Sequence, residues 1–422
     1  MTRPFRRRRW LVAVLFGLAL MGFLLLLAQD QETLTVQSPV PATDQGFAEY
    51  VASLVGAPVE SGDRYEVLTN GDEVFPAMLD ALRQAKRRIS FESFIYEDGV
   101  VGDQFTDEFV KAAQRGVDVR IVLDGFGAAL SGESEKKLTD AGVQVVWFNL
   151  PRPWSLEETN YRTHRKVLVV DGDVGFTGGI GLSDHWLGNA QSPDHWRDTQ
   201  FKVVGPAVRG LEASFYENWL ESGGLSAPAL DPRPPAQQDG AQSVVVWSNP
   251  TGGASNVKLL YLLSIAGARQ QIDIQSPYFI LDESTQWSLN AAVERGVRIR
   301  VVTDGDITDA MPVKDASRDG YQALLDVGVE IYEYQPTMMH VKAMVVDGVW
   351  SVFGSANFDN RSFELNDELT VAVHDHDLAR ALTRDLGADI QKSIRLDAAT
   401  WRQRPLWQKA REWFWSHYGE LF

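Results

Sequence analysis

The chain of 422 residues contains no cysteine. This absence excludes a disulfide framework and a thiolate metal site. The sequence also lacks an acidic cluster with the spacing of metal ligands, so we expect no metal and no other cofactor. Hydrophobic residues make up 44% and charged residues 23% of the chain. This is the composition of a globular protein, and the length allows two domains.

Positive charge is scarce outside the N-terminus. Five of the 40 basic residues lie in residues 1–9, which leaves 35 basic against 57 acidic residues, a balance of −22. A surface this acidic repels a polyphosphate, so non-specific binding to nucleic acid is disfavoured. We therefore expect no nucleic-acid partner. A locally basic pocket is still compatible with this balance.

The N-terminus carries the clear membrane signal. Five arginines in residues 1–9 precede residues 10–28, a run of 19 residues without a charge. As a helix, this run would be roughly 28 Å long, close to the hydrocarbon thickness of a bilayer. A cleavable signal peptide usually has a shorter apolar core and a small residue where Leu26 stands. We predict an uncleaved single-pass helix in the inner membrane, with the rest of the chain on the non-cytoplasmic face.

Two proline-containing segments divide the remainder of the chain. Residues 29–46 are polar and are interpreted as a tether. Residues 223–240 hold four prolines among alanine, glutamine and aspartate, which indicates an interdomain linker. We therefore predict domains at residues 47–222 and 241–398, followed by an aromatic segment at residues 399–422.

The two predicted domains resemble each other. Residues 113–125 align with residues 293–305 at an offset of 180, and a duplicated domain is the simplest explanation. Helix and strand patterns alternate in the first domain, which predicts α/β halves related by a pseudo-twofold axis, with mixed, largely parallel sheets. We expect strands at residues 89–95, 117–123 and 143–148, and helices at residues 74–85, 105–113 and 134–141.

The pattern His-x-Lys-x4-Asp occurs once in each predicted domain. The copies are His164, Lys166 and Asp171, and His340, Lys342 and Asp347. A glycine stands 14 positions after each histidine, and an apolar run typical of a buried strand lies between each lysine and aspartate. One such copy would most simply be accidental, but two in register favour a function. Two half-sites predict one active site between the domains.

The residue types of these motifs suit phosphoryl transfer. One imidazole can attack a phosphodiester to form a phosphohistidine, and a second can protonate the leaving alkoxide. The two lysines would neutralise the phosphate, and Ser355 and Asn357 could add neutral donors. Asp171 and Asp347 complete the catalytic motif, but they follow the apolar run, so we interpret them as more structural than chemical.

The paired motifs resemble the signature of the phospholipase D superfamily, and over residues 60–405 the chain is most similar to its bacterial cardiolipin synthases. Further shared phrases are Phe91-Glu92-Ser93-Phe94-Ile95-Tyr96, Thr177-Gly178-Gly179-Ile180, Trp196-Arg197-Asp198, Ser276-Pro277-Tyr278-Phe279, Gly354-Ser355-Ala356-Asn357 and Asn357-Phe358-Asp359-Asn360-Arg361-Ser362. The resemblance implies two phospholipase D-like domains and the transfer of a phosphatidyl group between phosphatidylglycerol molecules, with release of glycerol.

The resemblance also implies roles for individual residues. His164 would be the nucleophile and His340 the general acid and base. Acids downstream would orient each imidazole, Asp198 in the first half and Glu368 in the second. Gly181 departs from the family, which commonly has asparagine there. A missing donor can cost roughly 3 kcal/mol in a transition state, so either Ser183 replaces it or this half-site is weaker.

Three classes of function remain open at this point. The first is a phosphatidyltransferase, and the second is a phosphodiester hydrolase, more plausibly a phospholipase D than a nuclease. The third is a non-catalytic lipid-binding relative, although such a protein would be expected to lose a motif histidine or lysine. The C-terminal aromatic residues, Trp407, Trp413, Trp415 and Tyr418, predict either a helix packed on the core or one lying among lipid headgroups. Nothing in the sequence determines the oligomeric state.

Overall fold

The computed structural model describes residues 33–151, 160–227, 234–249 and 256–418. The predicted membrane anchor lies outside these ranges. The chain divides into two compact units, Met1–Thr35 and Val36–Phe422, and every element named below belongs to the second unit. Within the described ranges, no helix is both long and apolar enough to cross a bilayer.

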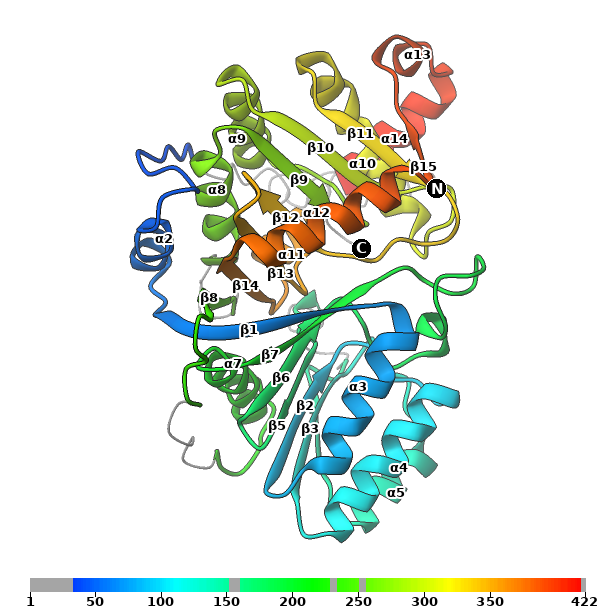
Figure 1. The fold of residues 1–422 in the computed structure, drawn as a ribbon. Helices are drawn as coiled ribbons and strands as arrows, with labels where there is room; N and C mark the ends of the chain where they lie inside the picture. Colours follow the sequence, from blue (N-terminus) through cyan, green and yellow to red (C-terminus); the bar gives the residue numbers. More distant parts are fainter. Residues whose placement is uncertain (1–32, 152–159, 228–233, 250–255, 419–422) are drawn as a thin grey trace, which may run out of the picture. The chain divides into compact units, whose positions relative to one another are not determined.

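The described part of the second unit is built on a mixed sheet of 15 strands (Figure 1). The strands are β1 (Val59–Thr69), β2 (Arg88–Ser93), β3 (Asp118–Asp124), β4 (Gln144–Phe148), β5 (Val167–Val170), β6 (Val174–Gly178), β7 (Thr199–Val204), β8 (Ala241–Trp247), β9 (Gln271–Gln275), β10 (Arg298–Asp304), β11 (Glu330–Tyr334), β12 (Ala343–Val346), β13 (Trp350–Gly354), β14 (Leu369–His374) and β15 (Ser393–Arg395). From the central β1–β8 pair, one half runs β7-β6-β5-β2-β3-β4 and the other β14-β13-β12-β9-β10-β11, with β15 at the edge. The repeated order confirms the predicted duplication.

Helices cover both faces of each half (Figure 1). They are α2 (Phe47–Val55), α3 (Asn70–Gln84), α4 (Val100–Gln114), α5 (Gly132–Asp140), α7 (Val208–Glu221), α8 (Asn256–Gly267), α9 (Glu283–Glu294), α10 (Met311–Val327), α11 (Asn360–Glu364), α12 (His376–Ile390), α13 (Ala398–Arg402) and α14 (Leu406–Tyr418), with a 3-10 helix η1 (Asp184–Trp186). The helices and strands predicted between residues 74 and 148 are confirmed with small shifts of their ends.

The strand between the lysine and the aspartate of each motif is buried on both faces, as its apolar run predicts. In β5, Val167 and Val169 point into a core shared by both halves, to which α7 and α12 contribute. The alternate residues, Leu168 and Val170, point into the core beneath α3, α4 and α5. The corresponding residues of β12 alternate in the same way. The histidine and lysine of each motif therefore precede a rigid central strand, and the aspartate follows it.

The prediction of largely parallel sheets is wrong. Among the strand pairs of the described residues, four are parallel and ten are antiparallel. Helix and strand alternate only as far as β4 and β11. After each motif the chain reverses through a tight turn, and a short turn can join only antiparallel strands. Asp171 and Gly172 in one half, and Asp347 and Gly348 in the other, have the positive φ angles that such turns need.

Residues 36–46, the later part of the predicted tether at residues 29–46, pack on the second half. Ala42 is fully buried, and its backbone N–H donates to the carbonyl of Gly267 at 2.9 Å. The ring of Phe47, the first residue of α2, packs edge-on against the ring of Trp350, with the ring centroids 5.0 Å apart. A side chain at residue 267 would lie 2.6 Å from the Phe47 ring, so glycine makes this contact possible. The predicted first domain, residues 47–222, thus begins with a helix that belongs by packing to the other half.

Strand β1 changes partner at Gly62. Residues Val59 to Asp63 pair with β8, whereas residues from Arg64 onward pair with β7. Gly62 has a φ of 94°, and a Cβ there would lie 2.4 Å from the Cβ of Ala236. Glycine therefore lets the chain kink at the junction of the two halves.

Candidate active site

The two motifs are each held by the opposite half of the protein. The backbone N–H of His164 donates to the carbonyl of Asp367 at 2.9 Å, and that of His340 donates to the carbonyl of Arg197 at 2.7 Å. Isolated bridges pair Thr163 with Asp367 and Arg197 with Met339. Each half thus fixes the backbone of the other half's histidine.

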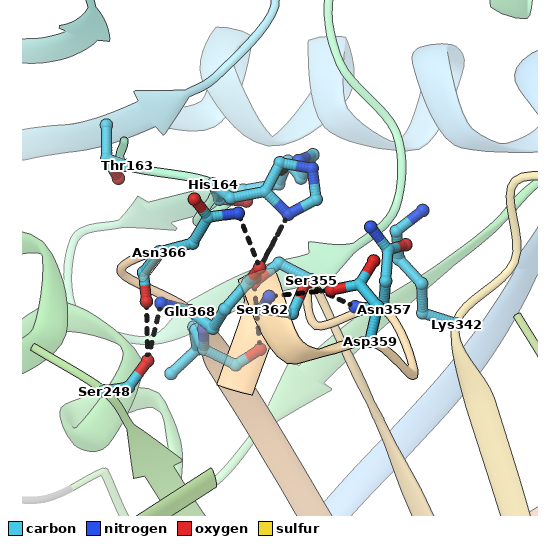
Figure 2. Close-up of polar contacts among 12 residues, drawn as sticks. Thr163, His164, Ser248, Lys342, Ser355, Asn357, Asp359, Ser362, Asn366 and Glu368 are labelled. Carbon is cyan, nitrogen blue, oxygen red and sulfur yellow. Dashed lines mark hydrogen bonds and ion pairs between the residues drawn. The ribbon is translucent and has the colours of Figure 1, made fainter. Parts of the chain in front are cut away.

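The imidazole rings are paired across the halves in the same way. His164 Nδ1 lies 2.9 Å from Glu368 Oε1 and 3.1 Å from Oε2 (Figure 2). His340 Nδ1 lies 2.8 Å from Asp198 Oδ2. The expectation that each acid orients the histidine of its own half is therefore wrong, although the two acids themselves were identified from the sequence.

This pairing fixes how each imidazole is presented. Both acids are fully buried, and a carboxylate in contact with Nδ1 accepts its proton in a hydrogen bond. The ring then carries its hydrogen on Nδ1, and the lone pair is on Nε2. Each histidine consequently offers Nε2 for attack or for proton transfer.

The two acids have different supporting donors. The Ser355 hydroxyl donates to Glu368 Oε2 at 2.5 Å (Figure 2). In the other half, the indole N–H of Trp186 donates to Asp198 Oδ2 at 3.0 Å, and the backbone N–H of Thr199 donates to Oδ1 at 2.8 Å. The Ser355 hydroxyl thus helps to orient Glu368, and its direct contact with phosphate stays a prediction. Trp186 lies outside every motif that the sequence revealed.

Asn357 remains available as a donor. Its backbone N–H donates to Ser362 at 3.0 Å, and its buried side-chain oxygen has no partner among the described residues. Figure 2 shows the side chain beside Lys342. The amide is therefore positioned next to an ammonium group and is not locked by a neighbouring residue.

The two lysines are buried as a like-charged pair. Lys166 Nζ donates to the carbonyl of His164, and Lys342 Nζ to that of His340, both at 2.8 Å. Burial and then the charge of Lys342 lower the pKa of Lys166 to about 7, and burial lowers the pKa of Lys342 to about 8. An anion between them would relieve both effects, so the site is preorganised for a phosphate group.

The imidazoles and acids titrate differently in the two halves. Burial lowers the pKa of His164 to about 4 and that of His340 well below its ordinary value, with His164 among the charges that lower the latter. Burial raises the pKa of Asp198 to about 6. Burial alone would also raise the pKa of Glu368, but His164 and Lys166 outweigh it and lower the pKa to about 2. Glu368 is thus an anion at neutral pH, whereas Asp198 titrates close to neutrality.

Asp171 and Asp347 lie at the other end of their strands, apart from the histidines. The carboxylate of Asp171 accepts three successive backbone N–H groups, from Lys86, Arg87 and Arg88 at 2.7–3.0 Å. Asp347 accepts those of Arg269, Gln270 and Gln271 at 2.8–2.9 Å. The structure therefore places both acids at the starts of β2 and β9, where they hold the backbone and contribute no group to the site.

Gly181 cannot be replaced by asparagine without displacing neighbours. A Cβ at this position would lie 3.0 Å from the Cβ of Ile95 and 3.3 Å from the ring of Trp186. The Ser183 hydroxyl accepts the backbone N–H of His185 at 3.4 Å and so caps η1. Trp186 packs against His340, with ring centroids 5.5 Å apart.

Comparison with known proteins agrees with this arrangement. A family model described as "Cardiolipin synthase, PLD-like domain" matches residues 78–191 and 261–390, one segment in each half. Cardiolipin synthase 1 of Bacillus anthracis is 32% identical over 393 residues, which is 90% of this chain and 77% of that protein. A cardiolipin synthase of Geobacillus thermodenitrificans is 33% identical over 387 residues, again covering 90% and 77%.

Solved structures share the fold at low identity. A phosphatidylserine synthase of Haemophilus influenzae superposes with a TM-score of 0.66 at 14% identity, over 89% of this chain and 97% of that one. A polyphosphate kinase of Porphyromonas gingivalis gives a TM-score of 0.53 at 15% identity, over 88% and 53%. The duplicated segments, the paired motifs and the curated relatives together show that the chain belongs to the cardiolipin synthase family of the phospholipase D superfamily.

Proposed function

We propose that this protein is a phosphatidyltransferase that joins two phosphatidylglycerol molecules and releases glycerol. The observation that carries the proposal is the crossed pairing of two histidines with two buried acids around two lysines. The chain is also 32–35% identical to several cardiolipin synthases, whose reaction uses phospholipid substrates.

In the first step, His164 Nε2 attacks the phosphorus of the donor lipid. A P–N bond forms, and the P–O bond to the glycerol headgroup breaks. The departing alkoxide takes a proton from Nε2 of protonated His340, and glycerol leaves. Both histidines are neutral in the empty site, but a bound phosphodiester anion raises the pKa of His340 and favours its protonated form.

In the second step, a hydroxyl of another phosphatidylglycerol attacks the same phosphorus. His340 Nε2 takes the hydroxyl proton, the P–N bond breaks, and His164 returns to its neutral form. Two phosphatidylglycerol molecules are thereby converted into one cardiolipin and one glycerol. Lys166, Lys342 and Asn357 stabilise the charge on the phosphate oxygens in both steps.

The acids support this division of roles. Glu368 stays ionised next to His164, so it stabilises the positive charge that develops on the imidazole when Nε2 bonds to phosphorus. Asp198, next to His340, has its pKa raised to about 6. An acid that titrates in this range suits His340, which must give and take a proton.

Lipid substrates imply an enzyme that associates with the membrane, and we propose the following topology for it. Residues 10–28 form a single-pass anchor in the inner membrane, and the catalytic unit lies on the non-cytoplasmic face. A reporter fused to the C-terminus should be active only outside the cytoplasm. Activity confined to the cytoplasm would reverse the topology.

Product analysis tests the proposed reaction. The full-length protein is reconstituted in phosphatidylglycerol vesicles without added metal, and a His164→Ala preparation serves as the control for contaminating enzymes. We expect cardiolipin and glycerol in equal amounts. Phosphatidic acid with glycerol would instead identify a hydrolase, and the absence of any product would refute both reactions.

A further inference from the structure

Helix α14 turns an apolar face to solvent. The exposed fractions are 83% for Leu406, 66% for Trp407, 56% for Trp413 and 47% for Phe414, and Ala410 between them is also exposed. These residues are spaced i, i+1, i+4, i+7 and i+8, so they lie on one side of the helix. In a surface helix this side normally faces the core.

Polar contacts hold the opposite side of α14 on the protein. Glu412 is fully buried and accepts hydrogen bonds from Arg404 at 3.0 Å and Gln408 at 2.8 Å. Arg411 and Ser416 donate to Asp315 and Asp319 of α10, both at 2.8 Å. The helix is therefore fixed with its apolar side outward, and turning that side inward would break these contacts.

The charge of this segment differs from that of the chain. Residues 398–422 contain four basic residues (Arg402, Arg404, Lys409 and Arg411) and two acidic ones, whereas the whole chain has a net charge of −17. Arg404 is nearly buried against Glu412, but Arg402 and Arg411 keep 64% and 42% of their side chains exposed while they pair with Asp326 and Asp315. Exposed tryptophans next to arginine and lysine side chains are typical of helices that lie in the headgroup layer of an anionic bilayer.

The exposed face is connected to the active site through α10. Strand β10 ends at Asp304, whose carboxylate accepts the backbone N–H of Met339 at 2.9 Å, one residue before His340. Helix α10 then begins at Met311, which is itself 46% exposed, and α14 packs along its first turns through Asp315. Contact of α14 with a surface would thus hold that surface near the catalytic groups.

We propose that the apolar face of α14, formed by Leu406, Trp407, Ala410, Trp413 and Phe414, docks on an anionic phospholipid bilayer. The lipid identity of the occupant rests on the proposed function, because both substrates reside in a bilayer. A second copy of the chain is the competing occupant, and the test below distinguishes it from a bilayer.

The absence of cysteine allows a direct test in the full-length protein. A single cysteine introduced as Ala410→Cys carries an environment-sensitive fluorophore, and Lys136→Cys on α5, where the side chain is 72% exposed, is the matched control. Both proteins are reconstituted in phosphatidylglycerol vesicles. We expect the label at residue 410 to be quenched by nitroxide lipids and protected from aqueous iodide, and the label at residue 136 to behave in the opposite way.

Two results would overturn the docking proposal. Iodide quenching at residue 410 as strong as at residue 136 would show that the face stays in water. Protection from both quenchers would show that protein covers it, either a second copy or residues 10–28. Neither readout depends on turnover, so docking and the proposed reaction can fail separately.

A kinetic test adds the functional consequence. The double variant Trp407→Ser, Trp413→Ser should lower cardiolipin formation on vesicles by about tenfold and leave turnover of a soluble short-chain phosphatidylglycerol unchanged. Unchanged rates on both substrates would contradict the proposal. An equal loss on both would indicate a damaged fold, and the quenching result at residue 410 then decides.

Discussion

The two halves of the site build one geometry from different side chains. The residue 15 positions after the motif histidine is Gly179 in the first half and Ser355 in the second. A Cβ on Gly179 would lie 2.4 Å from Asp198 Oδ1 and 2.7 Å from the carbonyl oxygen of His340. Glu368 is one methylene longer than Asp198, and Ser355 fits beside it as a hydrogen-bond donor.

The comparison shows that the length of each acid is matched to the size of the residue beside it. The shorter acid requires glycine, and the longer acid allows serine. The first half also has Gly181 where the second has Asn357, and Trp186 fills the space. The second half therefore has a side-chain amide at this position, whereas the first half surrounds His340 with aromatic rings, with ring centroids 5.5 Å away for Trp186 and 5.7 Å for Trp196.

Loss of either histidine should have the largest effect. His164→Ala removes the nucleophile and should lower cardiolipin formation by at least about 10⁴-fold. His340→Ala removes the proton donor and should cost about 10²–10⁴-fold. Initial rates on phosphatidylglycerol vesicles measure both. A smaller loss for His164→Ala than for His340→Ala would reverse the roles of the two halves.

Lys342→Met should cause the next largest loss of turnover. Removing one buried ammonium takes away charge stabilisation in the transition state, and we expect turnover to fall by about 10³-fold while the lipid still binds. The kcat on short-chain substrate measures the loss, and Lys166→Met is the matched variant in the other half. An undiminished kcat in Lys342→Met would mean that the second half is structural only.

An asparagine should support catalysis at position 357 and should not fit at the equivalent position 181. Asn357→Ala should lower kcat by about 10²-fold, because the amide stabilises the phosphate oxygens. Gly181→Asn should not restore a donor in the first half but should lower the melting temperature, because its Cβ meets Ile95 and Trp186. Faster turnover in Gly181→Asn at unchanged stability would contradict the packing argument.

Alkaline pH should lower the activity, because both halves then lose the charge of their lysine. Each lysine is an ammonium ion below its pKa and neutral above it, and these pKa values are about 7 for Lys166 and about 8 for Lys342. The kcat/KM of the free enzyme should therefore fall by about tenfold per pH unit between pH 7 and 8, and by about a hundredfold per unit above pH 8, where both ammonium groups lose their protons. A profile that stays flat to pH 9.5 would show that neither ammonium is required.

The smallest predicted effect on kcat concerns the residue beside each acid, Ser355 in the second half and Gly179 in the first. Ser355→Gly removes one hydrogen bond to Glu368 and should lower kcat by about tenfold. The mirror substitution Gly179→Ser adds a side chain where Asp198 and His340 leave no space, so it should be the more damaging of the two. Comparison of kcat and melting temperature for both variants checks this, and equal tolerance of the two would remove the argument from acid length.

The duplicated motif allowed much of the site to be predicted. His-x-Lys before an apolar run placed both residues at the entrance of buried strands, because the local pattern alone sets where such a strand starts. The crossed pairing of His164 with Glu368 was not predictable from spacing, because order along one half does not show which half an acid faces. Trp186 was missed for the same reason, since its hydrogen bond to Asp198 depends on tertiary contact.

Two further differences from the predicted structure depend on tertiary contacts and turns. Residues 29–46 were predicted to be a tether because they are polar with two prolines. Ala42 of this segment and the following Phe47 nevertheless pack against Gly267. The sheets looked largely parallel because the helix–strand alternation of residues 74–148 was extended to the whole half. The turns at Asp171 and Asp347 instead reverse the chain in both halves.

Mapping the covalent adduct tests the shared site most directly. The His340→Ala protein is incubated with phosphatidylglycerol, denatured, digested, and its peptides analysed by mass spectrometry for an acid-labile phosphatidyl group. A nucleophile held by the opposite half's Glu368 should carry the group on the peptide that contains His164, and the wild-type protein should carry it there too. An adduct on the His340 peptide of the wild-type protein, or cardiolipin formation by His164→Ala, would contradict the account.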